Sequence, residues 1–577
     1  MDGGFLVFVT GRWIIAETID IHSTIGDTLD AQTARFPERE VLVHATSGER
    51  FTYLQFQAEV DRIARGFMAL GIAKGHHVGI WATNYTEWLL TQYATAKIGA
   101  VLVTVNPAYR THELAYLIEQ AQLNALVIIG RFRTSDYVAM VNELVPELRD
   151  SNPGELSSSQ FPHLRHVVFI PPHDDPSASS PAGMWRWDDL SVRGAAVSPD
   201  TLRSRQAECQ PDDVINIQYT SGTTGNPKGA MLTHHNLLAN ALHVGDCMEM
   251  TELDRLCIPV PFYHCFGCVM GSLACVTHGS TMVIPSEYFD PLQTLRALEQ
   301  ESCTAVHGVP TMFIAQLGHP DFAQFDLRSL RTGIMAGSPC PIEVMREVID
   351  RMGASRITIA YGQTEASPVV TQTLADDTIE RRVSTVGKVL PGVEVRLIDP
   401  DTEREVAVGE QGELQTRSTM VMKGYFNMPE ATTAAIDSDG WLHTGDLATA
   451  DEDGYYKITG RLKDMIIRGG ENIYPREIEE FLYTHPDVAD VQVIGVPDER
   501  FGEEVMAWVM LRAGADASTD DIREFCRGRI AHYKVPRYVR IADEFPMTVT
   551  GKIQKFRMRE MAVEELGLQT AAGIETA

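Results

Sequence analysis

Short apolar segments alternate with longer amphipathic ones between residues 77 and 129, and this alternation limits the possible folds more than any other feature. The pattern predicts strands and helices in turn over residues 77–81, 86–98, 101–105, 111–121 and 125–129. Parallel strands need a crossover connection of this length, so the repeat implies a parallel sheet with helices on its faces. We therefore expect an α/β fold whose ligands bind at the carboxyl ends of the strands.

The length of the chain indicates more than one domain. Its 577 residues exceed the size that one hydrophobic core usually serves. Glycines and charged residues gather at residues 460–471, and the shorter sequence after them predicts two strands followed by a helix over 520–530. We expect a large N-terminal α/β domain over residues 1–462 and a small C-terminal α+β domain over residues 463–577.

The charge of the chain limits its partners. Acidic residues outnumber basic ones, 78 to 49, and the formal net charge is −29. Such a protein repels a polyphosphate strand, so nucleic acid is not expected as its main partner. No apolar run approaches the roughly 18–20 residues of a membrane-spanning helix, and the first residues lack the basic start and cleavage site of a signal peptide. We expect a cytoplasmic protein, while peripheral membrane contact and a homo-oligomer both stay open.

Nine cysteines are too sparse for a disulfide framework in a chain of this length. Two of them, Cys265 and Cys268, form a CxxC pair beside His264. A structural zinc site of four cysteines needs a second pair, and no second CxxC accompanies this one. We therefore expect no metal at these cysteines.

One segment has the composition of a phosphate-binding loop. Residues 219–229 read YTSGTTGNPKG, between strands expected at 214–218 and 230–233. Glycines let the backbone approach phosphate oxygens, hydroxyls donate hydrogen bonds to them, and the lysine adds a positive charge. The order differs from the Walker A motif, because a proline precedes the lysine and a glycine follows it. Composition alone leaves two readings open: a triphosphate-binding loop, or a flexible hairpin without a ligand.

This loop is the first of seven motifs that together resemble the acyl-adenylate-forming superfamily, which contains acyl-CoA synthetases, aryl-CoA ligases, luciferase and peptide-synthetase adenylation domains. The other six follow in the same order as in that superfamily and extend the resemblance to about residues 25–560. They read PFYHCFG at 261–267, AGSPC at 336–340, YGQTE at 361–365, WLHTGD at 441–446, GRLKDMIIRGGENIYP at 460–475 and PMTVTGKIQK at 546–555.

The resemblance implies an activity with ATP, Mg²⁺ and coenzyme A. A carboxylate is a weak electrophile, so acylation of a thiol requires activation, which these enzymes achieve by forming an acyl-adenylate and pyrophosphate. The step brings a carboxylate towards a triphosphate, and catalysis must therefore position and neutralise charge. The alternatives are an aryl-CoA ligase, an enzyme that loads a carrier-protein thiol, and a silent nucleotide-binding scaffold.

The resemblance also implies which residues bind ATP and promote adenylation. Lys552 is similar to the catalytic lysine that bridges the carboxylate and the α-phosphate, and Asp446 to the carboxylate that accepts the ribose hydroxyls. Glu365, together with Thr224, is expected to bind Mg²⁺, a hard cation that prefers oxygen ligands. Thr220 and Glu365 are also assigned to catalysis. The remaining nucleotide-binding positions are Ser221, Gly222, Thr223, Gly225, Lys228, Gly337, Ser338, Pro339, Tyr361, Gly362, Gln363, Thr364 and Arg461.

A second group of residues is implied for the acid and for coenzyme A. His264 matches a catalytic gate between the acyl pocket and the coenzyme A tunnel, and the tunnel is assigned to Gly469, Gly470 and Glu471. Lys463 matches the family hinge, so the resemblance implies a mobile small domain that rotates between an adenylating and a thioester-forming arrangement. Acetate-specific relatives resemble one another in carrying a tryptophan where this chain has Gly362, so a longer acid, such as a medium- or long-chain fatty acid, is favoured. Val309 and Ile334 complete the expected acyl pocket.

Overall fold

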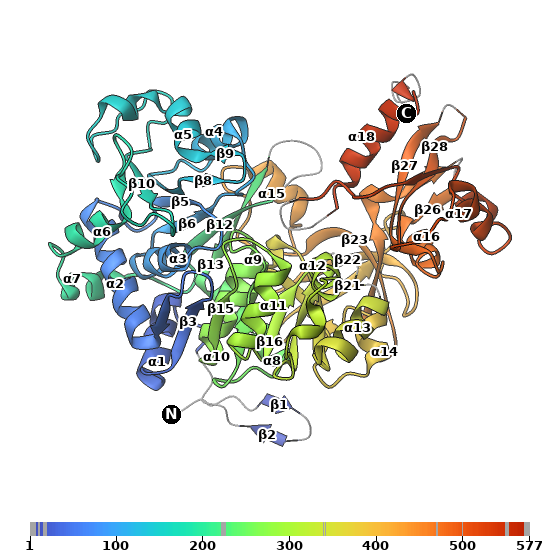
Figure 1. Ribbon diagram of the computed structural model, residues 1–577, viewed down its shortest axis with the longest axis horizontal. Helices are drawn as coiled ribbons and strands as arrows, with labels where there is room; N and C mark the ends of the chain where they lie inside the picture. The colour runs from blue at the N-terminus through green and yellow to red at the C-terminus, as the bar shows by residue number, and fades with distance from the viewer. Residues whose placement is uncertain are drawn as a thin grey trace. The chain divides into compact units, whose positions relative to one another are not determined.

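The computed structural model describes residues 7–9, 12–14, 20–220, 227–337, 340, 342–468, 471–498, 500–548 and 553–569 (Figure 1). The chain forms two compact units. The first comprises residues 1–383, 390–393 and 418–438, and the second comprises residues 384–389, 394–417 and 439–577. The domain boundary predicted between residues 462 and 463 does not coincide with the border of these units, because residues 394–417 and 439–461 group with the C-terminal segment. That the small domain moves about a boundary at Lys463 stays a prediction.

The first sheet of the first unit confirms the strand and helix repeat. Its order is β11-β10-β7-β5-β6-β12-β13, and every neighbouring pair is parallel except β12 with β13. The crossover helices α3 (Thr86–Ile98) and α4 (Thr111–Gln120) connect β5 to β6 and β6 to β7, as the sequence predicts. The strands are β5 (His77–Trp81), β6 (Val101–Thr104), β7 (Ala125–Ile129), β10 (His166–Ile170), β11 (Trp185–Arg186), β12 (Val214–Thr220) and β13 (Lys228–Thr233).

A second sheet in the same unit is also mainly parallel. The strands of this sheet that belong to the first unit run β19-β18-β17-β16-β14-β15-β3-β4, with β19 antiparallel to β18 and β4 antiparallel to β3. Strands buried on both faces explain the continuous apolar runs of this region. The strands are β3 (Glu40–His44), β4 (Arg50–Thr52), β14 (Arg255–Cys257), β15 (Thr281–Ile284), β16 (Ala305–Gly308), β17 (Thr332–Ala336), β18 (Arg356–Gly362) and β19 (Val369–Gln372).

Helices flank these sheets, and several of them begin where a side chain caps the first turn. In α2, Thr52 and Gln55 form a capping box, and Gly71 follows the helix with a φ of +85°. The helices are α1 (Ile25–Arg35), α2 (Tyr53–Ala69), α3 (Thr86–Ile98), α4 (Thr111–Gln120), α5 (Tyr137–Leu144), α6 (Trp187–Gly194), α7 (Pro199–Gln206), α8 (His234–Cys247), α9 (Cys265–Gly267), α10 (Ala274–His278), α11 (Pro291–Gln300), α12 (Pro310–Leu317), α13 (Ile342–Met352), α14 (Ile379–Ser384) and α15 (Pro429–Ala435).

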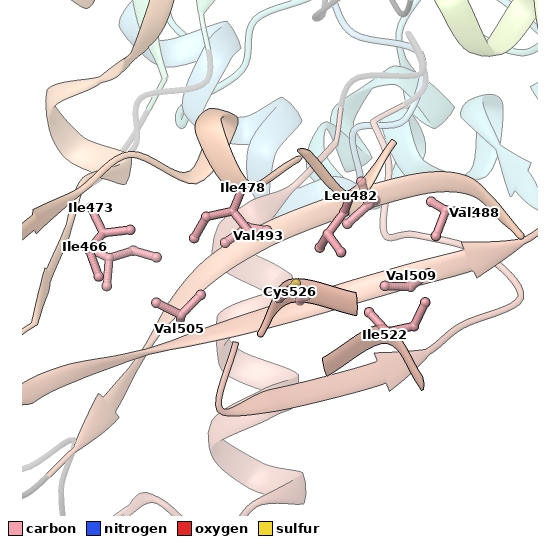
Figure 2. Close-up of a cluster of buried hydrophobic side chains, with 12 residues drawn as sticks. Ile466, Ile473, Ile478, Leu482, Val488, Val493, Val505, Val509, Ile522 and Cys526 are labelled. Carbon is pink, nitrogen blue, oxygen red and sulfur yellow. The ribbon is translucent and has the colours of Figure 1, made fainter. Parts of the chain in front are cut away.

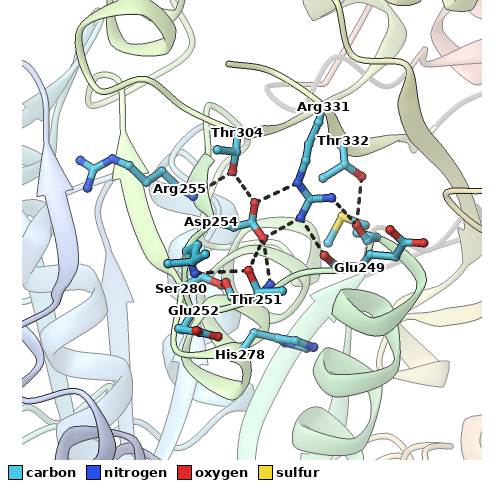
Figure 3. Close-up of polar contacts among 12 residues, drawn as sticks. Glu249, Thr251, Glu252, Asp254, Arg255, His278, Ser280, Thr304, Arg331 and Thr332 are labelled. Carbon is cyan, nitrogen blue, oxygen red and sulfur yellow. Dashed lines mark hydrogen bonds and ion pairs between the residues drawn. The ribbon is translucent and has the colours of Figure 1, made fainter. Parts of the chain in front are cut away.

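A buried polar network joins the amino ends of three parallel strands of the second sheet (Figure 3). Asp254 precedes β14, Thr304 precedes β16 and Arg331 precedes β17. The Asp254 carboxylate accepts hydrogen bonds from Thr304 Oγ1 at 2.6 Å and from Arg331 Nη2 at 2.6 Å. It also accepts one from the backbone N–H of Thr251 at 2.8 Å. The network therefore fixes these strands relative to one another at the end away from the expected site.

The second unit contains two mainly antiparallel sheets. One is β21 (Glu394–Ile398), β22 (Gly412–Arg417), β23 (Leu442–Ala450) and β24 (Tyr456–Arg461) in that order. The other runs β26-β25-β28-β27, with β29 parallel to β28. Its strands are β25 (Ile466–Arg468), β26 (Glu471–Ile473), β27 (Val488–Asp498), β28 (Gly502–Leu511) and β29 (Tyr538–Ile541).

Three helices pack with the second of these sheets: α16 (Pro475–Leu482), α17 (Thr519–Cys526) and α18 (Lys555–Glu565). Aliphatic side chains from β25, β27, β28, α16 and α17 form one core, in which Ile478, Leu482 and Ile522 face the strands (Figure 2). The helix expected over 520–530 ends earlier, because Arg527 is extended and Gly528 has a φ of +70°. Among the described residues, no helix is both long and apolar enough to cross a membrane.

Candidate active site

The motifs of the first unit follow the carboxyl ends of parallel strands, as the fold class predicts. Thr220 is the last residue of β12, and Glu365 lies three residues beyond β18 in a short 3₁₀ turn over Thr364–Ala366. Val309 follows β16 and Gly337 follows β17. Motif residues therefore lie at the carboxyl ends of strands in both sheets, and α/β enzymes bind their ligands at these ends.

The Glu365 side chain connects the first sheet to the turn that follows β18 of the second sheet. Its Oε1 accepts a hydrogen bond from Thr220 Oγ1 at 3.4 Å, although 145 residues separate the two in sequence. The same oxygen accepts one from Tyr425 Oη at 2.8 Å. The Glu365 side chain is only 9% exposed, yet both of these partners are neutral hydroxyls. Among the residues that the structure describes, the hydrogen-bond partners of this carboxylate are hydroxyls, so its oxygens can still serve as ligands of a cation.

The phosphate-loop strands form an antiparallel pair, as expected for a hairpin. Thr220 is the cross-strand partner of Lys228 in the register of β12 and β13. The Lys228 ammonium lies 5.0 Å from the centroid of the Tyr425 ring, within the range of a cation–π contact. Lys228, Thr220 and Glu365 therefore all lie around Tyr425.

Sequence reasoning missed Tyr425. It joins the site through tertiary contacts, including an isolated bridge to Ala230, and its spacing from the phosphate loop carries no signal. Burial first, and then the neighbouring Glu365 carboxylate, raise the pKa of Tyr425 far above its usual value. The phenol therefore stays protonated and donates to Glu365.

Glu365 fits the magnesium role that the resemblance implies. Mg²⁺ is usually held by one or two carboxylates together with substrate phosphates, and it keeps several waters. In the described part of the chain there is no group of three or more His, Cys, Asp or Glu residues that could hold a metal ion by itself. A single buried carboxylate with hydroxyl partners, next to a phosphate loop, matches a metal that arrives with its nucleotide.

Backbone conformation and packing explain why glycine occupies two positions of the nucleotide motifs. Gly337 has a φ of +90°, which favours glycine. At Gly362 an added Cβ would lie 1.8 Å from the carbonyl oxygen of Pro368. Glycine is thus required at position 362 by the backbone of this chain, whatever acid is bound. The missing side chain does not by itself indicate a long acyl pocket, and the assignment of Gly362 to that pocket stays a prediction.

The other residues expected near the acid or the base of the nucleotide lie on strands of the second sheet or on the segments that follow them. Tyr361 is on β18 opposite Thr371 of β19 and is half-buried, and Gln363 precedes the turn that contains Thr364. His264 caps the amino end of α9, with its ring 5.1 Å from that of Tyr263. Val309 and Ile334 are buried, Ile334 completely. Their contact with an acid stays a prediction.

In the second unit, Asp446 and Arg461 are brought together. They are cross-strand partners in β23 and β24, and Arg461 Nε lies 2.7 Å from Asp446 Oδ1. Asp446 is buried at 2% exposure, and Gly445 before it has a φ of +68°. An oriented carboxylate at a strand bend can accept two vicinal hydroxyls, as the ribose role requires. Lys463 is exposed in the turn Leu462–Asp464, two residues beyond β24, and Glu471 begins β26.

Some expected residues lie outside the described part of the chain. They belong to the phosphate loop, the adenine loop, the coenzyme A tunnel and the catalytic lysine motif. They are Ser221, Gly222, Thr223, Thr224, Gly225, Ser338, Pro339, Gly469, Gly470 and Lys552. Their roles stay predictions.

Comparison with known families decides what kind of protein has this architecture. The model of the AMP-binding enzyme family matches residues 29–426, well over half of the chain. The model of the AMP-binding enzyme C-terminal domain matches residues 477–552. The chain belongs to the AMP-binding enzyme family. The expectation of an acyl-adenylate-forming enzyme with an α/β fold is confirmed.

Individual relatives match over nearly the whole chain. YngI of Bacillus subtilis (strain 168), whose name assigns it provisionally to the acyl-CoA synthetases, is 54% identical over 96% of this chain and 99% of its own. ACSF2 of Danio rerio, named a mitochondrial medium-chain acyl-CoA ligase, is 44% identical over 95% of this chain and 89% of its own. The ATP-bound structure of MatB from Rhodopseudomonas palustris superposes with a TM-score of 0.78 and 29% identity, covering 93% of this chain and 99% of MatB.

Proposed function

We propose that the chain is an ATP-dependent acyl-CoA ligase. It joins a carboxylic acid to the α-phosphate of ATP, releases pyrophosphate, and transfers the acyl group from the adenylate to coenzyme A with release of AMP. The observation that carries this proposal is the cluster at Glu365, where Thr220 and Tyr425 hold a buried carboxylate beside Lys228 and the phosphate loop. That cluster offers anion-binding groups and a cation ligand side by side, as adenylation requires.

The roles of the residues follow from the chemistry of adenylation. Lys228 and the hydroxyl of Thr220 bind and orient phosphate oxygens, and Asp446 holds the ribose. Lys552 bridges the attacking carboxylate and the α-phosphate, which lowers the repulsion between two anions. Mg²⁺, bound with ATP at Glu365, supplies charge neutralisation at the phosphates. Each residue therefore acts by position and charge.

A medium- or long-chain fatty acid is the proposed substrate class. The named medium-chain ligase at 44% identity supports it, as do the buried apolar residues Val309, which follows β16, and Ile334, in the middle of β17. For the second half-reaction, Gly469 and Gly470 are proposed to line the tunnel for the thiol arm, because glycine permits close backbone approach. Lys463 is proposed as the hinge that exchanges the two arrangements of the small domain.

The test of the proposed function separates its two half-reactions. Purified protein is incubated with ATP, Mg²⁺ and straight-chain or aromatic acids, and pyrophosphate release is measured before and after coenzyme A is added. We expect release that depends on the acid, and acyl-CoA only when coenzyme A is present. Acid-independent release, or none with any acid, would contradict the proposal. An acyl-adenylate that passes to a carrier-protein thiol but not to coenzyme A would contradict the second step.

Lys552→Ala tests the division of labour within the site. Adenylation should fall by about 100-fold or more, the usual cost of removing one preorganised electrostatic group. Thioester formation from premade acyl-adenylate should persist, because the lysine acts only in the first arrangement. Lys534→Ala is the control, since Lys534 pairs with Glu477 on the same unit and has no proposed ligand. Equal loss in both half-reactions would show that Lys552 has a structural role.

A further inference from the structure

The CxxC pair beside His264 has a partner that the proposed reaction does not explain. Gln218, on β12 two residues before Thr220, places its carboxamide between the two sulfur atoms. Cys265 Sγ donates to Gln218 Oε1 at 3.1 Å, and Gln218 Nε2 donates to Cys268 Sγ at 3.1 Å. All three side chains are buried, with exposures of 2% or less.

The chemistry of the three groups is complementary. Burial raises the pKa of Cys268 to about 12, and that of Cys265 well above its usual value, so both cysteines carry protons at neutral pH. A thiol is a weak donor and its sulfur a weak acceptor, while a carboxamide offers both functions. One amide therefore satisfies two buried sulfurs, where an apolar side chain would leave the Cys265 thiol without this acceptor.

This contact connects the nucleotide side of the site to the segment that carries His264. Cys265 begins α9 directly after His264, and Cys268 begins the π-helix η2 (Cys268–Leu273). π-Helical turns are uncommon and are frequent at functional sites. A polar path thus runs from the end of β12, through Gln218, to the residues on both sides of α9.

We propose that Gln218 is a positioning residue for the acid-binding side of the site, acting through Cys265 and Cys268 on the segment that carries His264. This inference rests on the proposed function. It gives the CxxC pair a role that is neither metal binding nor redox chemistry. Displacement of catalytic groups by about 1 Å from a change outside the reacting atoms is enough to cost about 100-fold in rate.

Two other amides keep the segment in place when Gln218 is changed. Asn84 donates from Nδ2 to Val260 O at 3.0 Å and accepts from the Phe262 N–H at 3.0 Å. Gln92 Nε2 donates to Cys268 O at 3.1 Å. Gln218→Leu, which conserves volume, is therefore expected to fold and to shift the segment only on its sulfur side.

The test is a double-mutant cycle on acid binding. Gln218→Leu, Cys265→Ala and the double variant are assayed by acid-dependent pyrophosphate release, with the acid that the unmodified protein uses best among those of two to sixteen carbons. Gln218→Leu should raise the acid KM by about 10- to 100-fold, and the ATP KM by much less. The double variant should be no worse than Gln218→Leu, because both changes remove one contact.

Gln32→Leu is the matched control. Gln32 is also a buried amide, 1% exposed, and donates to Thr277 O at 2.9 Å between α1 and α10. It should lower thermal stability without changing the acid KM. An unchanged acid KM in folded Gln218→Leu, an equal rise in the acid and ATP KM values, or an equal effect of Gln32→Leu would overturn the proposal. Failure of the unmodified protein to release pyrophosphate with any acid would instead contradict the proposed function.

Discussion

The two ends of the parallel strands in the second sheet each carry a buried carboxylate, and the two carboxylates are used differently. At the amino ends, Asp254 accepts five hydrogen bonds, two of them from the Arg331 guanidinium. At the carboxyl ends, Glu365 has hydroxyl partners in Thr220 and Tyr425. In the described part of the chain, Asp254 is paired with an arginine, whereas the hydrogen-bond partners of Glu365 are hydroxyls that leave its carboxylate able to bind a cation.

The difference shows how one fold separates stability from catalysis. A buried charge with a paired partner holds the strands in register, and removing it leaves the partner uncompensated. A buried charge with neutral partners costs stability but is prepared to bind a cation and its phosphates. Changes at the two ends should therefore have opposite consequences for activity and stability.

Glu365→Gln is expected to have the largest effect. The amide keeps an oxygen that can accept from Tyr425 and Thr220 but removes the negative charge. Pyrophosphate release should fall by about 100- to 1,000-fold, the scale of losing one preorganised electrostatic interaction. Without Mg²⁺ and ATP the urea midpoint should rise, because the variant no longer buries a charge whose partners are neutral. The measurement is kcat/KM for ATP across a Mg²⁺ titration, together with urea unfolding. Full activity in the variant would remove Glu365 from the metal site and end the contrast between the strand ends.

Asp254→Asn is the reciprocal change and should act on stability. The variant loses its charged acceptor for Arg331 and Thr304, which should cost about 2–3 kcal/mol, seen as a lower urea midpoint. The KM values for ATP and acid should stay as they are in the unmodified protein.

The control for Asp254 is Asp326→Asn. Asp326 also pairs with an arginine, Arg328, but on the surface, where ion pairs contribute little. Its urea midpoint should match that of the unmodified protein. If Asp254→Asn unfolds at the same midpoint too, the network at the amino ends does not stabilise this sheet.

The pH dependence of unfolding should isolate the Asp254 charge. Burial alone would raise the pKa of Asp254, but the hydrogen bonds from Arg331 and Thr304 outweigh it and hold the pKa below its usual value. Because the folded pKa is the lower one, the stabilisation is complete above the unfolded pKa of about 3.9 and is lost as the pH falls through the folded value. The stability difference between the unmodified protein and Asp254→Asn should therefore shrink below about pH 4. A difference that is constant from pH 7 to pH 3 would contradict this origin.

Sequence alone was sufficient for elements with a strong local signal. The strands and helices between residues 77 and 129 match the prediction to within one residue, because their periodicity is fixed by burial. The position of Thr220 and Glu365 at strand ends also follows from the α/β class. The order of the strands within the sheet could not be predicted in this way. β5 lies between β6 and β7, and this order depends on contacts that no local pattern records.

The hydrogen-bond partners of the motif residues could not be predicted from the sequence. Tyr425 and Gln218 enter the site by long-range hydrogen bonds, 60 residues from Glu365 and 47 residues from Cys265 respectively. Gly362 illustrates the converse limit. The sequence suggested space for an acyl chain, but the Pro368 carbonyl accounts for the glycine by backbone packing. A substitution at Gly362 would therefore test packing before it tested substrate length.

The length of acyl chain that the site accepts is better tested by changing the acid than by mutating the protein. The effect of each added methylene should be the smallest effect on activity that we expect at the carboxyl ends of the strands. If an apolar pocket buries the tail, each added methylene should contribute about 0.8 kcal/mol, or about fourfold in kcat/KM, until the pocket is full. Pyrophosphate release is measured for acids of two to sixteen carbons at one ATP concentration. Dicarboxylic acids of equal length are the control, because their second carboxylate would be buried without a partner and should be rejected. A kcat/KM that does not change with length, or equal use of the dicarboxylic acids, would mean that the tail stays in water. The acyl site would then recognise only the carboxylate end of its substrate.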